Sequence, residues 1–163
     1  MSVELTMLAY SVALLFVVIL IQANVGIMAQ GLMPLANSRD DLPPPGAFQA
    51  RMKRVVDNHR EGLTLFAPLV LIAAQQGVST STTVLGAQLF FYSRVAHAVL
   101  YILDVPMIRP LAWGVGIAGT VMIFLAIFPL VSRWRRDAFE ARRWRDSDLG
   151  DEPGSGGSRT DED

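Results

Sequence analysis

Long stretches of this 163-residue chain carry no charged side chain, and they constrain its fold more than any other feature. One runs from Leu5 to Ser38 and another from Pro110 to Ser132. A helix needs about 20 mostly apolar residues to cross the ~30 Å hydrocarbon core of a bilayer, and both stretches are long enough. A soluble domain rarely lacks charge over such lengths, because about 25 % of its residues are charged. The sequence therefore predicts an all-α integral membrane protein.

Loop signals divide residues 1–132 into four predicted spans. Gly77 follows two glutamines that end the second span, and Asp104-Val105-Pro106 ends the third, because the residue before proline avoids helical geometry. The second span reaches full length only if its polar N-terminal turns belong to the same helix. The spans are predicted at about residues 5–35, 48–76, 82–103 and 110–132. We expect a multi-pass four-helix bundle.

The remaining 31 residues hold 16 of the chain's 29 charged side chains. Residues 133–145 combine six arginines with aromatic residues, which predicts a basic interfacial helix at the lipid headgroups. Residues 146–163 are acidic and rich in Gly and Ser, which predicts a disordered tail. Basic residues divide almost equally between the two sides of the predicted bundle, so they do not decide its orientation.

Composition excludes several functions. The net charge of −1 gives no support to nucleic-acid binding, which needs a clustered basic face. The absence of cysteine removes disulfides, thiolate metal sites and a cysteine nucleophile. The two histidines, His59 and His97, are too few for a metal site of their own.

Ionisable residues inside the predicted spans are the candidate site, because each is costly at membrane depth. At 100° per residue, two sets each fall on one helical face. The second span carries Arg54, Asp57, Asn58 and Glu61, and the third carries Arg94, His97 and Tyr101. Arg109 begins the fourth span on the same predicted side of the membrane.

Two interpretations of these residues stay open. They form interhelical salt bridges, such as Arg94 with Glu61, or they bind an anion. The arginines outnumber the available acids when Arg51 and Arg60 are counted, which favours an anionic ligand. His59 is predicted at the boundary, facing the headgroups. The Phe90-Phe91-Tyr92 run is predicted to face lipid or the core.

Three motifs together resemble the MAPEG family, the membrane-associated proteins in eicosanoid and glutathione metabolism. The first is Arg54-x-x-x-Asn58-x-x-Glu61, which continues to Leu69. The other two are Arg94 to Tyr101 and Pro106 to Trp113, and all three are similar to bacterial members of the family. The resemblance covers about residues 5–131.

The resemblance implies a homotrimer whose sites lie between subunits and bind glutathione as co-substrate, with a lipophilic substrate entering from the lipid. Arg109 matches the arginine that stabilises the glutathione thiolate, and is the expected catalytic residue. The expected binding residues are Arg54, Asn58, Glu61, Arg94, His97, Tyr101 and Trp113. The implied activity is that of a glutathione-dependent transferase or peroxidase acting on lipophilic electrophiles or hydroperoxides. The implied location is the bacterial inner membrane, with membrane lipids as further partners.

This chain also departs from the glutathione-using pattern. Asp57 stands where many members have another arginine, and the first span contains no arginine. Pro110 replaces a small hydroxyl residue beside Arg109. These changes keep a second hypothesis open, in which the chain is a non-catalytic lipid-binding adaptor or structural trimer.

Overall fold

The computed structural model describes residues 1–37 and 42–128, and all regular structure within them is helical. The helices are α1 (Val3–Gln30), α2 (Leu32–Ala36), α3 (Ala47–Gln75) and α4 (Ser81–Ile102), followed by a helix from Arg109 to Phe128. The all-α prediction is confirmed for this part of the chain. The interfacial helix at 133–145 and the disordered tail at 146–163 lie outside the described residues.

The first span differs from its prediction. The sequence predicts one helix to about Leu35, but α1 ends at Gln30 and the short α2 follows. Gly31 separates the two helices with φ = 82°, a left-handed conformation that only glycine adopts without strain. The absence of a side chain at this position therefore sets where the long helix stops.

Helix α1 and the Arg109–Phe128 helix are each long and apolar enough to cross a membrane. Helices α3 and α4 reach 29 and 22 residues, but their crossing stays a prediction. Large apolar side chains on α1 are exposed, including Phe16 at 61 % and Met28 at 87 %. An apolar face of this extent requires lipid or another protein as its environment.

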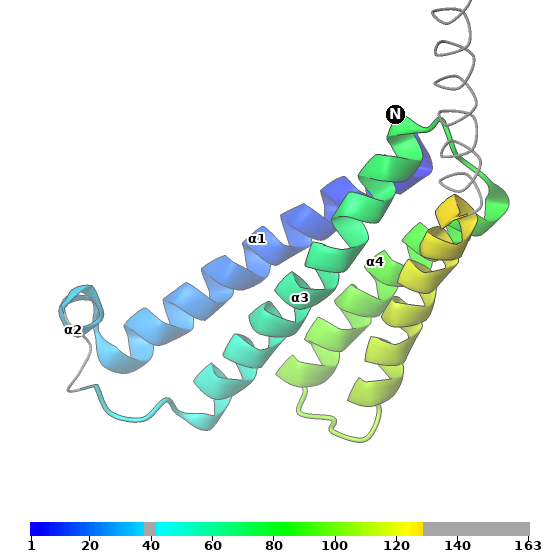
Figure 1. Cartoon of the computed structure of the whole chain (residues 1–163). Coiled ribbons are helices and arrows are strands. Elements are labelled where there is room, and N and C mark those ends of the chain that lie inside the picture. Colours follow the sequence, from blue (N-terminus) through cyan, green and yellow to red (C-terminus); the bar gives the residue numbers. More distant parts are fainter. Residues whose placement is uncertain (38–41, 129–163) are drawn as a thin grey trace, which may run out of the picture. The chain divides into compact units, whose positions relative to one another are not determined.

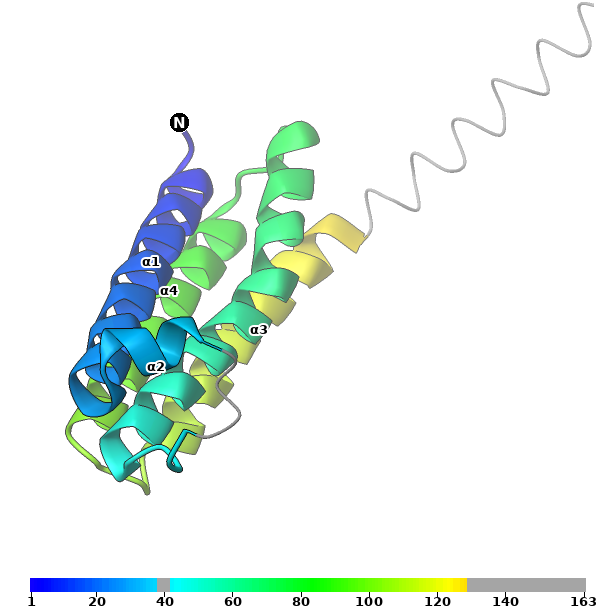
Figure 2. The same ribbon diagram turned by 90° about the vertical axis from the view of Figure 1, so that its left-hand side faces the viewer.

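Helices α1, α3 and α4 lie side by side and contact one another in pairs (Figures 1 and 2). One cluster of buried apolar residues joins α3, α4 and the Arg109–Phe128 helix, and within it Phe66 and Phe90 stack with ring centroids 3.9 Å apart. A second cluster joins Val18 of α1 to α3 and α4. Packing thus fixes the polar positions of α3 and α4 relative to each other.

The start of α1 is tied to the start of α4 by a buried carboxylate. Glu4 is only 2 % exposed and accepts a hydrogen bond from Thr83 Oγ1 at 2.6 Å. Ser79 Oγ, in the connection between α3 and α4, donates to the same carboxylate at 3.0 Å. These donors stabilise a buried acid that otherwise carries a large desolvation cost.

Candidate functional site

The polar face of α3 points away from the core of its own chain. The buried stripe of α3 comprises Met52, Val55, Val56, His59, Gly62 and Phe66. At 100° per residue, Arg54 and Glu61 fall on the opposite side of the helix, and both are exposed. The two residues are therefore accessible from outside the chain.

His59 contradicts its sequence-based placement. The prediction put it at the membrane boundary facing headgroups, yet it is 2 % exposed. It lies on the inward stripe of α3 between Val56 and Gly62, so the rotation of α3 carries the imidazole into the interior. In the Phe90-Phe91-Tyr92 run of α4, Phe90 is buried in the core and Tyr92 is 61 % exposed.

Arg94 is the most deeply placed cation in the described residues, at 2 % exposed. Its Nη1 donates to Asn58 Oδ1 of α3 at 2.7 Å, and its Nη2 donates to the Trp113 carbonyl at 3.4 Å. The salt bridge to Glu61, one of the two interpretations left open by the sequence, is not formed within the described residues. The pairing with Asn58 prevails because Asn58 borders the buried stripe while Glu61 faces outward.

Two glycines make room for this guanidinium. A Cβ at Gly62 of α3 would lie 3.2 Å from Arg94 Nη1, and a Cβ at Gly116 would overlap the Arg94 guanidinium. The Arg94 guanidinium also lies 5.2 Å from the Phe90 ring centroid. Neither glycine was predicted to belong to the site, although a glycine on a helix that packs against a buried arginine is a signal that the sequence contains.

Arg94 has no ion-pair partner within residues 1–37 and 42–128, and its Nε lacks a hydrogen-bond partner there. A buried cation without a counter-ion costs stability.

We therefore expect the Arg94→Met protein to unfold at the wild-type temperature or above it. Its free energy of unfolding should rise by up to about 2 kcal/mol, because methionine fills similar space without a charge. Thermal unfolding in detergent measures this, and a clear loss of stability would instead assign Arg94 a structural role through Asn58.

Arg109, Tyr101 and His97 form a second group, at the end of α4. The Arg109 guanidinium lies 4.3 Å from the Tyr101 ring centroid, within the range of a cation–π contact. Tyr101 is half-buried and its ring centroid is 4.8 Å from that of buried His97. Three of the residues named from the sequence are thus brought together.

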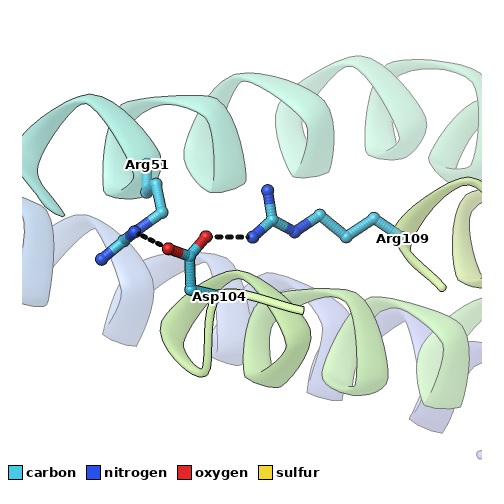
Figure 3. A network of polar contacts seen from close by, with 3 residues as sticks. All are labelled: Arg51, Asp104 and Arg109. Atoms are coloured by element: carbon cyan, nitrogen blue, oxygen red, sulfur yellow. Dashed lines mark hydrogen bonds and ion pairs between the residues drawn. The ribbon is translucent and has the colours of Figure 1, made fainter. Parts of the chain in front are cut away.

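Asp104 links this group to the start of α3 and was missed as a site residue (Figure 3). Arg109 Nη2 donates to Asp104 Oδ1 at 2.7 Å, and Arg51 forms an ion pair with the other carboxylate oxygen. The hydrogen bond from Arg109, together with the charge of Arg51, holds the pKa of Asp104 below its ordinary value. The carboxylate is therefore ionised at neutral pH. The sequence offered Asp104 only as part of a helix end.

A large open cavity of about 1080 Å³ lies between the end of α1, α2 and the start of α3. Its wall is mainly apolar, and Lys53, Arg54 and Asp57 contribute its charged groups. Lys53 and Asp57 pair with each other, whereas Arg54 forms no ion pair in the described part of the chain. Arg54 therefore presents at this cavity a positive charge that no described carboxylate neutralises.

The eight residues predicted from the sequence do not form one cluster in a single chain. Asn58, Arg94 and the Trp113 carbonyl meet in the interior, while the Trp113 side chain is 45 % exposed. Arg109, Tyr101 and His97 lie at the end of α4, and Arg54 and Glu61 face outward. The arrangement offers cationic groups both inside the chain and on its surface, which suits a ligand with several separated charges.

Comparison with protein-family models matches the chain to the MAPEG family over residues 7–129. The matched range comprises most of the chain and includes all eight predicted site residues. The comparisons with curated proteins and with solved structures gave no match.

Proposed function

Because the chain belongs to the MAPEG family, which includes glutathione transferases and peroxidases as well as non-catalytic proteins, we propose that it is a membrane-embedded glutathione-dependent transferase or peroxidase. Its second substrates are lipophilic electrophiles or hydroperoxides. The observation that carries the proposal is Arg109, a guanidinium 15 % exposed that lies against Tyr101 and whose Nε has no hydrogen-bond partner in the described residues.

The residues fit the chemistry of glutathione, which carries two carboxylates, one ammonium group and one thiol. Arginine side chains suit the carboxylates, and the exposed Glu61 suits the ammonium group. Glutathione supplies a thiol that is nucleophilic as its thiolate. Arg109 favours that thiolate by its charge, because a guanidinium does not release its proton at neutral pH. His97 supports the placement of Tyr101, and Tyr101 supports that of Arg109.

The outward orientation of Arg54 and Glu61 supports a site shared between copies of the chain. A ligand on these two side chains rests on the outer face of α3, where a neighbouring subunit supplies the other wall. We therefore propose a homotrimer of multi-pass subunits in the bacterial inner membrane, with its site on the cytoplasmic side, where glutathione is abundant. Trp113, exposed on the single chain, then borders the site for the lipophilic substrate.

A non-catalytic lipid-binding or structural trimer is the second candidate. Two observations favour it. Asp104 forms ion pairs with both Arg51 and Arg109. Asp57 forms ion pairs with Lys53 and, at 3.7 Å, with Arg60. These carboxylates neutralise cations that an anionic ligand needs.

Turnover separates the two candidates. The full chain is purified, reconstituted in vesicles and assayed with glutathione and either a lipophilic electrophile or a lipid hydroperoxide. The transferase or peroxidase proposal predicts conjugate or disulfide formation that depends on the protein. Glutathione binding without turnover on either substrate would favour the non-catalytic candidate.

A further inference from the structure

Asp104 holds two arginines that belong to different helices (Figure 3). Arg51 comes from the first turns of α3 and Arg109 from the start of the last described helix, and their guanidinium groups approach the carboxylate from opposite sides. The arginine side chains are 22 % and 15 % exposed, whereas that of Asp104 is 57 % exposed. One exposed negative charge thus faces two largely buried positive charges, which leaves an excess of +1.

The backbone at Asp104 permits an aspartate but does not require one. Its φ is 58°, and the Val105 amide donates to the Leu100 carbonyl at 3.0 Å while the Asp104 amide donates to the Tyr101 carbonyl at 3.4 Å. This is the hydrogen-bond pattern of a Schellman helix end, in which the left-handed residue is usually glycine. Aspartate and asparagine adopt this conformation more readily than other residues with a Cβ, but glycine is favoured over both. The contacts of the carboxylate therefore explain Asp104 better than the turn does.

We infer that Asp104 is an internal counter-ion that competes with anionic ligands for Arg51 and Arg109. The inference rests on the proposed function, and the ligand class is a small carboxylate- or thiolate-bearing compound such as glutathione. The Nε atoms of Arg51 and Arg109 are both buried without a hydrogen-bond partner in the described residues, so each guanidinium has donor capacity that Asp104 does not use. An incoming anion takes over the donors that Asp104 now engages.

The competition is weak enough to be overcome by a ligand. An ion pair with an exposed partner contributes little to stability, because water solvates the separated charges well. Displacing Asp104 into solvent therefore costs little, and its carboxylate needs to move only far enough to free the two arginines. Removing the carboxylate should strengthen anion binding.

The test compares the full chain with Asp104→Asn and Asp104→Gly in detergent, using isothermal titration with glutathione and, separately, with sulfate. Asparagine and glycine both tolerate a positive φ, so both variants keep the helix end. We expect both to bind each anion about two- to fivefold more tightly, the factor that corresponds to losing an exposed ion pair. Asp104→Glu retains the carboxylate and should bind within about twofold of the wild type.

The outcomes separate this inference from the proposed function. Tighter sulfate binding by both variants, with no glutathione binding by any protein, would support the role of Asp104 as a competing counter-ion. It would refute the proposal that the chain uses glutathione. Glutathione binding that is unchanged or weaker in both variants would refute the role of Asp104 as a competing counter-ion and leave the proposed function standing. Absence of binding of both anions to every protein would overturn both.

Discussion

Replacing Arg109 by glutamine is expected to lower the thiolate formed from bound glutathione by at least about tenfold, while binding changes by less than about threefold. Loss of the guanidinium raises the pKa of the bound thiol, and each unit of that rise corresponds to a tenfold change in its ionisation equilibrium. Turnover should fall further, by about 10²-fold, the usual effect of removing one preorganised electrostatic donor. Thiolate absorbance in the ultraviolet and calorimetry of glutathione binding measure the two effects separately.

Arg60→Gln is the matched control for this substitution. Arg60 is also an arginine and lies on α3, but its side chain is 66 % exposed and its only ion pair within the described residues is with Asp57 at 3.7 Å. The control should leave thiolate formation and turnover unchanged. Equal losses in the two variants would show that overall positive charge, and not the position of Arg109, favours the thiolate.

Replacing Gly86 by alanine is expected to destabilise the fold by about 3 kcal/mol, at the upper end for overpacking a close contact. A Cβ at Gly86 would lie 2.7 Å from the Gly119 carbonyl oxygen, so α4 and the Arg109–Phe128 helix must move apart to accept it. The obstacle is backbone, which cannot rotate away as a side chain does. Small residues at helix crossings permit such close approach in membrane proteins.

Gly114→Ala provides the same chemical change on the facing helix without the contact. A Cβ at Gly114 meets nothing within 4 Å, and alanine favours a helix by about 1 kcal/mol over glycine. We expect this variant to unfold at the wild-type temperature or slightly above it in detergent. A Gly86→Ala protein as stable as Gly114→Ala would refute the close crossing of the two helices.

Helical structure is the part of the fold that could be predicted, because it depends on local signals. The predicted second helix at 48–76 and the observed α3 differ by one residue at each end. Its C-terminal end was predictable because the Gln75-Gln76-Gly77 sequence is a local signal that ends the helix. The break at Gly31 was missed because apolar residues continue on both sides of it. The approach of Gly86 to Gly119 was missed because it depends on how two helices cross.

The candidate site was predictable in its residue types more than in its geometry. Periodicity places Arg54 and Glu61 on one face of α3, but it does not tell which face turns toward the core, since both lipid and protein are apolar surroundings. That rotation decides that His59 is buried and that Arg94 pairs with Asn58. Asp104 and Arg51 are 53 residues apart, so no local pattern predicts their ion pair.

Titration of the wild-type protein with glutathione, followed by the ultraviolet absorbance of the thiolate, tests the central claim most directly. The proposed function predicts that absorbance grows with glutathione up to millimolar concentration and saturates as the sites fill. It also predicts that thiolate persists below the ordinary thiol pKa of about 8.5, because Arg109 stabilises the charged form. Absence of a saturable thiolate signal at millimolar glutathione and neutral pH would contradict it.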